Sequence, residues 1–339
     1  MTRTRRIATE EAFATAEQMQ AIERVIAGGQ RDADSPFWSM MARGQSPFAQ
    51  RVMRQLLDVE GERLEIMDAY GVDMHVLSLT SPGVQTLPAD DAVSMARRSN
   101  DLLAAVIERH PARFAGLATI APQAPKDAAR EIERAVTQLG FNGVMINAHT
   151  NDAYLDEEQF LPIFEAASAL GTPIYIHPRA PSSGMAQPYL KYGLETAIWG
   201  YGAETGLHAV RLLVSGLFDR FPTLKIILGH MGEGIPFWLW RLDYMHRHGS
   251  GRPALERTIT DYFRDNFVIT TSGMHGPEAL RFCIELLGST NIMWAIDYPY
   301  QETPGAVDFL QTVEIAEADR AHIFHRTTER VFGIAPVNP

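Results

Sequence analysis

Four ionisable side chains stand where short apolar segments end, and together they could hold a metal or move a proton. They are Glu10, His177, His230 and Asp297. Carboxylates combined with neutral imidazoles form a mixed oxygen and nitrogen ligand set for a divalent first-row metal. Without a thiolate the set suits Mn²⁺ and Zn²⁺ alike, so ligand chemistry leaves the metal open. A metal-free acid–base pair of His230 and Asp297 is the alternative.

These side chains would meet only if the apolar segments are strands of one sheet. Most of the segments are short continuous apolar runs, which is typical of parallel strands buried on both faces. The predicted strands are Arg6–Ala8 continuing to Glu10, Met74–Leu79, Phe114–Ile120, Gly143–Asn147, Pro173–His177, Leu224–His230, Phe267–Ser272 and Ile292–Asp297. Helical patterns lie between them, and three of these stop directly before a glycine. The predicted helices are Asp90–Arg109, Pro125–Leu139, Asp156–Leu170 and Gly276–Leu287.

Eight strands separated by helices predict an α/β fold, a (β/α)8 TIM-like barrel, whose catalytic groups share the mouth at the carboxyl ends of the strands. A doubly wound open sheet is the alternative, but no glycine-rich phosphate loop follows any predicted strand. Residues 29–60 and 180–203 exceed a minimal barrel after strands 1 and 5. We predict that both are cap or lid segments, with surface decoration as the alternative. No linker or repeat divides residues 1–339, which predicts a single domain.

Composition excludes several classes of protein. The chain has 339 residues, 46% of them hydrophobic, and a net charge of −11. It lacks the basic stripe of a nucleic-acid-binding protein. A lone cysteine, Cys283, excludes a disulfide framework within the chain. The sequence shows neither a secretory apolar core nor an apolar run that could span a bilayer, so we expect a cytoplasmic protein acting on a small molecule.

Longer motifs resemble a known family. Residues 229–233, 236–243 and 296–300 are similar to those of the amidohydrolase-related decarboxylases, which act on aminocarboxymuconate semialdehyde, γ-resorcylate or 5-carboxyvanillate. Residues 6–14, 79–85, 154–158, 204–208 and 241–246 most resemble the 5-carboxyvanillate type. Together these motifs span nearly the whole chain.

The resemblance implies a role for each matching position. Glu10, His177 and Asp297 match the metal ligands, and His230 matches a histidine beside the metal. Arg241 matches a contact to the substrate carboxylate that reaches into a neighbouring subunit, which implies a homodimer or homotetramer. Its alternative is a surface salt bridge with Asp243 or Glu233.

One position departs from many relatives and shapes the expected reaction. Ala12 stands where many relatives carry a metal-binding histidine, and the 5-carboxyvanillate type also lacks that histidine. The resemblance therefore implies non-oxidative decarboxylation of an ortho-hydroxy aromatic acid, 5-carboxyvanillate to vanillate, in the catabolism of lignin-derived aromatics. Mn²⁺ is the favoured cofactor and Zn²⁺ the second.

Decarboxylation requires a proton donor, because the ring carbon must be protonated before CO₂ leaves. Asp297 is the first choice and His230 the second, with Glu233 expected to orient His230. Further candidates could line the pocket around the substrate ring or form hydrogen bonds to it. They are Arg51, Phe13, Thr80, Asn147, His208, Tyr298 and Tyr300, with Trp38 and Trp199. A lactone or amide hydrolase on the same barrel is one alternative. A barrel that binds an aromatic acid without turning it over is another.

Overall fold

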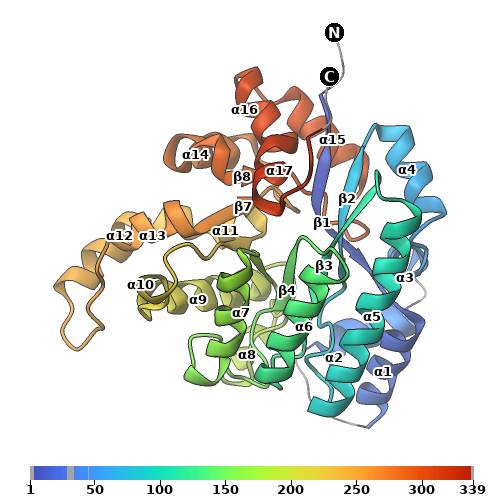
Figure 1. The fold of residues 1–339 in the computed structure, drawn as a ribbon, viewed down its shortest axis with the longest axis horizontal. Helices are drawn as coiled ribbons and strands as arrows, with labels where there is room; N and C mark the ends of the chain where they lie inside the picture. Colours follow the sequence, from blue (N-terminus) through green and yellow to red (C-terminus); the bar gives the residue numbers. More distant parts are fainter. Residues whose placement is uncertain (1–3, 29–33, 45, 337–339) are drawn as a thin grey trace.

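Eight parallel strands, each paired with the next in chain order, form the centre of the protein (Figure 1). The computed structural model describes residues 4–28, 34–44 and 46–336. The strands are β1 Ile7–Phe13, β2 Met74–Leu79, β3 Phe114–Thr119, β4 Gly143–Asn147, β5 Ile174–His177, β6 Ile226–Leu228, β7 Phe267–Thr270 and β8 Ile292–Met293. All eight predicted strands are confirmed, β2 and β4 to the residue.

The seam between β8 and β1 closes the barrel. The backbone N–H and the hydroxyl of Thr9 both donate to the carbonyl of Trp294, at 3.1 and 2.9 Å. The N–H of Ala12 donates to the carbonyl of Tyr298 at 2.7 Å. The predicted (β/α)8 barrel is therefore confirmed, and the open sheet is excluded.

Helices cover the outside of the barrel (Figure 1). They are α1 Ala16–Ala27, α2 Ser35–Arg43, α3 Pro47–Leu57, α4 Glu62–Tyr70, α5 Ala89–Arg109, α6 Pro125–Thr137, α7 Leu161–Leu170, α8 Ser183–Leu190, α9 Gly200–Val214, α10 Leu217–Arg220, α11 His230–Glu233, α12 Ile235–His248, α13 Ile259–Asn266, α14 Pro277–Leu287, α15 Thr303–Thr312, α16 Glu317–Ala321 and α17 Thr327–Phe332, with short turns η1 Glu158–Phe160, η2 Ser289–Asn291 and η3 His322–Arg326. The helix predicted from Asp156 begins later, at Leu161, because Pro162 occupies its first turn and fixes the start there.

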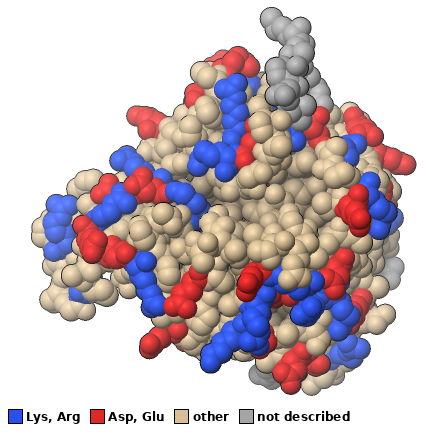
Figure 2. All heavy atoms as spheres, in the orientation of Figure 1, with Lys and Arg blue, Asp and Glu red and all other residues tan. Residues whose placement is uncertain are grey.

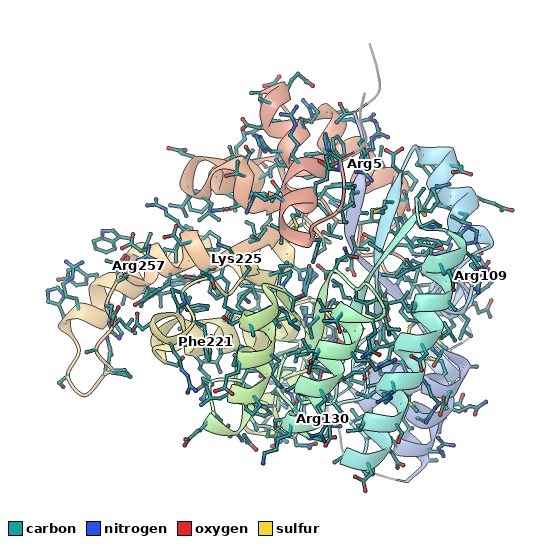
Figure 3. The ribbon with its side chains drawn as sticks, in the orientation of Figure 1. Arg5, Arg109, Arg130, Phe221, Lys225 and Arg257 are labelled. Carbon is teal, nitrogen blue, oxygen red and sulfur yellow. The ribbon has the colours of Figure 1, made fainter. Side chains whose placement is uncertain are left out.

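The amino end of the barrel is filled by side chains. Met74 and Val76 of β2 belong to an inner apolar cluster, while Leu77 packs toward the helices. Phe332 and Ile334, near the end of the chain, pack against the same inner cluster. The Arg5 side chain (Figure 3) ties the start of the barrel to this end through Glu329, at 2.7 Å. Only the carboxyl end of the barrel is left for chemistry.

A separate apolar cluster lies beside the carboxyl end of β1. It joins Trp38 of α2 and Leu56 of α3 to Ala12, with Tyr300 packed against it. These helices belong to the segment predicted as a cap; its residues 29–33 and 45 lie outside the described residues. The other predicted cap segment contains α8 and the first turn of α9.

The face of the molecule drawn in Figure 2 carries charged side chains of both signs. Figure 2 shows acidic and basic side chains interspersed on the face in view. Among the described residues, no helix has both the length and the apolar character that crossing a membrane demands. In Figure 1, α12 and α13 extend away from the barrel as an arm.

Candidate active site

Glu10, at the carboxyl half of β1, is held from one side. Its carboxylate oxygen Oε2 accepts hydrogen bonds from the hydroxyls of Tyr175 and Ser272, and a third from Thr270 at 3.2 Å. All four side chains are buried. Three donors on one oxygen fix the direction of the whole carboxylate.

The other oxygen, Oε1, points toward two imidazoles. It lies 3.4 Å from Nε2 of His177 and 3.7 Å from Nε2 of His230. Among the described residues it has no hydrogen-bond partner, although it is buried. A buried carboxylate oxygen is costly unless a cation or a proton compensates it. This atom is therefore aimed at a place where a cation fits.

His177, the last residue of β5, presents Nε2 to that place. Its Nδ1 lies 2.7 Å from the carbonyl of Pro178, which accepts the N–H and leaves the lone pair on Nε2. Burial lowers the pKa of His177 below its ordinary value. A neutral imidazole with its second nitrogen anchored to a carbonyl is the form that binds metals.

Asp297 completes the group from the loop after β8. Its backbone has a left-handed φ of 73°, and its side chain is half-buried. A Cβ at Gly273 would lie 3.6 Å from Asp297 Oδ2 and 3.3 Å from His230 Cδ2, so this glycine keeps open the space beside both groups. One ligand atom each from Glu10, His177 and Asp297 lie within 4.8 Å of one another. This mixed oxygen and nitrogen set fits a divalent cation.

His230 stands beside these ligands. The strand predicted to include it ends at Leu228, because His230 takes a left-handed φ of 50° and begins α11. Its Nδ1 lies 2.8 Å from Oε1 of Glu233, so the expected orienting contact is present. Burial alone would lower the pKa of His230, but the carboxylates of Glu233 and Glu10 outweigh it and raise the pKa to about 10.

The protonation of this group makes metal affinity depend on pH. Burial, reinforced by Glu10, raises the pKa of Asp297 well above its ordinary value, so a proton on the metal-free carboxyl competes with the cation. Lowering the pH strengthens the competition between this proton and the cation. We expect Mn²⁺ affinity to rise from pH 6 to pH 8, by about tenfold per pH unit for each proton displaced. Electron paramagnetic resonance of free Mn²⁺ would measure it, and a dissociation constant independent of pH would contradict it.

Three of the other predicted side chains come together at the mouth. The Tyr300 hydroxyl lies 2.6 Å from the Thr80 hydroxyl. Arg51 of α3 donates to the carbonyl of Pro299 at 3.0 Å, which places its guanidinium beside the loop that carries Asp297. A cap side chain and two barrel side chains thus border the same loop.

Asn147 also stays a candidate. It ends β4 directly opposite His177 of β5. Its side-chain oxygen is buried and has no hydrogen-bond partner among the described residues. An acceptor of this kind is available for a substrate hydroxyl or for water.

Phe13 and Tyr298, by contrast, do not wall the mouth. Phe13 is 1% exposed and belongs to the cluster between the barrel and its helices. The ring of Tyr298 lies beneath the guanidinium of Arg63, at 4.5 Å, and beside His75. Both side chains point toward the surrounding helices, because their chain neighbours Ala12 and Asp297 point toward the mouth of the barrel.

Nor does the structure bring His208 to the group. The backbone N–H of Leu155 donates to its Nε2 at 3.0 Å, and its charged neighbours are His149 and Arg211. Burial lowers its pKa to about 3, so it is a neutral structural acceptor. Trp199 is 63% exposed, and Trp38 is buried in the apolar cluster beside the carboxyl end of β1.

Arg241, on α12, is exposed. The alternative salt bridges are not formed: Asp243 accepts from the backbone of Ile259 at 2.7 Å, and Glu233 pairs with His230. No ion pair or hydrogen bond engages its guanidinium within the described parts of the chain.

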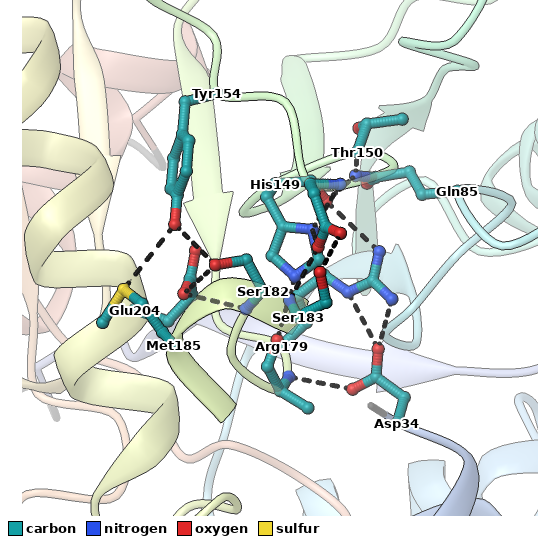
Figure 4. Close-up of polar contacts among 12 residues, drawn as sticks. Asp34, Gln85, His149, Thr150, Tyr154, Arg179, Ser182, Ser183, Met185 and Glu204 are labelled. Carbon is teal, nitrogen blue, oxygen red and sulfur yellow. Dashed lines mark hydrogen bonds and ion pairs between the residues drawn. The ribbon is translucent and has the colours of Figure 1, made fainter. Parts of the chain in front are cut away.

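A buried ion pair ties the first predicted cap segment to the residues that follow β5, where the second one begins (Figure 4). Nε of Arg179, just after β5, donates to Asp34 Oδ2 at 2.8 Å, and the Ala180 N–H donates to Asp34 Oδ1 at 2.9 Å. Arg179 also donates to the carbonyl of His149 at 3.2 Å. Because removing one partner of a buried pair typically costs 3–5 kcal/mol, Asp34 and Arg179 are strong anchors for this end of the site.

Sequence reasoning missed the groups that support Glu10. Tyr175 stands two residues before His177 on β5, and Thr270 and Ser272 stand two residues apart at the end of β7. Residues two apart on a strand share a face, so this spacing could have identified them.

The comparisons with known proteins agree with this geometry. The amidohydrolase family model matches residues 33–334. The chain belongs to the amidohydrolase family. A γ-resorcylate decarboxylase of Polaromonas sp. in this family is 38% identical over 338 residues, covering 96% of this chain and 98% of that protein.

Solved structures of this family extend the agreement. A 5-carboxyvanillate decarboxylase of Sphingomonas paucimobilis is 50% identical and superposes with a TM-score of 0.95, covering 98% of this chain and all of that one. A 5-carboxyvanillate decarboxylase of Novosphingobium aromaticivorans is 41% identical, with a TM-score of 0.95 and coverage of 98% and 96%, and it holds manganese and 4-hydroxy-3-methoxy-5-nitrobenzoic acid. The predicted resemblance is confirmed: the chain is a carboxy-lyase of the amidohydrolase family.

Proposed function

We propose that this protein catalyses the metal-dependent, non-oxidative decarboxylation of an ortho-hydroxy aromatic acid, with 5-carboxyvanillate as substrate and vanillate as product. The observation that carries the proposal is the group of Glu10, His177 and Asp297, in which the buried oxygen Glu10 Oε1 has no protein donor among the described residues. The product places the reaction in the catabolism of lignin-derived aromatic acids.

Glu10, His177 and Asp297 would hold the cation, and Mn²⁺ is the one we propose, since manganese occupies the related Novosphingobium structure. A bound divalent cation orients a substrate through its oxygens and lowers the pKa of a phenol. The absence of a side-chain ligand at Ala12, in the position of the missing histidine, leaves the site less crowded than a hydrolase-type centre.

Asp297 would deliver the proton. Its carboxylate, which is deprotonated when it holds the cation, would take up a proton once the substrate is bound. It would then donate this proton to the ring carbon that bears the leaving carboxylate, and the ring would lose its aromaticity. The electron pair of the C–C bond then returns to the ring as CO₂ departs, and aromaticity is restored. His230, held by Glu233 at 2.8 Å, steadies the phenolate oxygen and is the second choice as donor. Solvent returns the proton to Asp297.

5-Carboxyvanillate has a second carboxylate, which γ-resorcylate lacks, and a positively charged side chain would be needed to bind it. Arg51 borders the loop that carries Asp297. Arg241 is exposed on the α12 arm, with no ionic partner among the described residues. An arginine fork matches a carboxylate in a bidentate manner. Arg51, whose guanidinium also lies 3.9 Å from Glu302, and Arg241 of a neighbouring subunit would favour the diacid over the monoacid. Thr80, Tyr300 and Asn147 would hydrogen-bond the ring substituents.

A second copy of the chain would bring Arg241 to that mouth. The α12 arm exposes large aromatic side chains: Phe237 is 75% exposed, Trp240 73% and Trp238 52%. Monomeric proteins rarely expose contiguous apolar patches of this kind, which mark protein interfaces. We therefore propose a homodimer, or a homotetramer built from it, in which the arm of each subunit donates Arg241 to its neighbour.

Mixed oligomers test this donation in trans. Arg241→Ala and Asp297→Asn should each be nearly inactive alone. In a heterodimer, the Asp297→Asn subunit still donates its intact arginine to the site of the other subunit. After unfolding and refolding an equal mixture, we expect about a quarter of wild-type activity, because half of the dimers carry one complete site. Cis action of Arg241 would leave the mixture as inactive as its components.

A panel of hydroxybenzoates assayed for CO₂ release tests the substrate. We expect turnover of 5-carboxyvanillate by the Mn²⁺-loaded protein, with kcat/KM well above that for γ-resorcylate. Preference for γ-resorcylate would overturn the diacid assignment and keep the reaction class. A hydrolysis product without CO₂ would overturn the reaction class.

A further inference from the structure

Glu11 grips the backbone on both sides of Asp297. Its Oε1 accepts the N–H of Ile296 at 2.9 Å, and its Oε2 accepts the N–H of Tyr298 at 3.1 Å. The side chain is fully buried. One carboxylate on β1 thus holds the two residues that flank the aspartate after β8.

The conformation of Asp297 explains why such a grip is needed. Its φ of 73° lies in the left-handed region, which residues with a Cβ adopt uncommonly, although aspartate does so more often than most. Without the grip, the loop would relax toward an ordinary backbone conformation, and the carboxyl would turn away from Glu10 and His177. We propose that Glu11 is a positioning residue that aims Asp297 into the metal and proton-transfer site.

Arg63 of α4 braces the same arrangement. Its guanidinium is fully buried, donates to the carbonyl of Ala12 at 2.6 Å and lies over the ring of Tyr298 at 4.5 Å. Burial raises the pKa of Glu11 to about 8, and the positive charge of Arg63 opposes that rise. The brace therefore contacts both the strand that carries Glu11 and the residue that follows Asp297.

The inference rests on the proposed function, in which Asp297 is a ligand and donor, and the two can fail separately. Wild-type protein that binds no Mn²⁺ would count against the proposed site. If the wild type binds Mn²⁺ and the Glu11 variant binds it equally tightly, only the positioning role would be contradicted.

The substitution Glu11→Gln tests the grip with little change in volume. Glutamine keeps one oxygen, but its amide N–H₂ would face one of the two backbone donors, so one hydrogen bond is lost. Thr9→Val is the matched control. Thr9 is as deeply buried on β1 as Glu11 is. Its hydroxyl donates to the carbonyl of Trp294, which directly follows β8, but it does not contact the residues that flank Asp297.

We expect Glu11→Gln to weaken Mn²⁺ binding, measured by electron paramagnetic resonance of free Mn²⁺, by about 10- to 100-fold. The control should stay within about threefold of wild type, even where the melting temperatures of the two variants fall equally. Equal affinity in Glu11→Gln and wild type would overturn the proposal. Equal weakening in both variants would also overturn it, because the effect would then be general destabilisation.

A double-mutant cycle separates action through Asp297 from direct action on the metal. In an Asp297→Asn background, Glu11→Gln should weaken Mn²⁺ binding much less than it does in wild type. A full additional loss in that background would contradict the positioning role.

Hydrogen exchange on the wild-type protein keeps the proposal testable if Glu11→Gln does not fold. The peptide covering residues 294–300 should already exchange slowly in metal-free protein, and Mn²⁺ should change its rate little. Rapid exchange that stops only after Mn²⁺ is added would mean that the metal, and not Glu11, orders this loop.

Discussion

Asp297→Asn should lower kcat for decarboxylation by about 10²- to 10⁴-fold, the contribution of a positioned acid, while the fold stays intact. Asparagine has the shape of the aspartate but lacks an acidic proton to transfer to the ring carbon. Burial, and then the charge of Glu10, raise the pKa of the wild-type carboxyl, which favours the protonated form that donates. Steady-state CO₂ release measures kcat, and a thermal melt measures the fold.

Asp308→Asn provides the control for this variant. Asp308 is exposed on α15, so the same change of charge there should leave kcat near that of wild type. Near-native turnover of Asp297→Asn with Mn²⁺ bound would remove Asp297 as the donor and leave His230, whose Nε2 lies 3.7 Å from Glu10 Oε1.

Exhaustive chelation should bring CO₂ release to background, and Mn²⁺ should restore it. With Glu10 Oε1 uncompensated, the mouth has nothing to gather the substrate oxygens or to lower the pKa of the phenol. Circular dichroism of the chelated protein should match that of the loaded protein, because the three ligands lie on a barrel whose core forms without them. Full activity in protein with no detectable metal would contradict the proposed site.

The positions of the strands were readable because most of the buried strands are short apolar runs, four of them followed by an ionisable group. His177 closes β5 as expected. The direction of the side chains in β1 was not readable. Strict alternation from Ile7, which faces inward, would turn Glu11 and Phe13 inward.

A bulge in β1 reverses this pattern. Between Ala8 and Glu11 the strand holds one residue more than β2 does across the same pairing. The extra residue turns Glu10 and Ala12 toward the mouth and sends Glu11 and Phe13 outward. Sequence reasoning therefore found Glu10 but misjudged Phe13 and gave Glu11 no role.

Long-range contacts were equally beyond the sequence. Asp34 and Arg179 are 145 residues apart, and nothing in either local pattern indicates that they pair. His208 matched a family motif, yet it lies fully buried on α9 with its Nε2 engaged by Leu155. Motif matching identifies a residue type, but only the packing of the helix decides which side it faces.

The central claim is that the protein breaks a C–C bond and protonates the ring carbon. Mass spectrometry of the products formed in D₂O from 5-carboxyvanillate carrying ¹³C in the carboxyl group next to the phenol tests both parts at once. The account predicts one ¹³CO₂ for each vanillate, with one deuterium at the carbon that lost the carboxyl. A product that keeps the ¹³C label, or that carries no deuterium at that carbon, would contradict it.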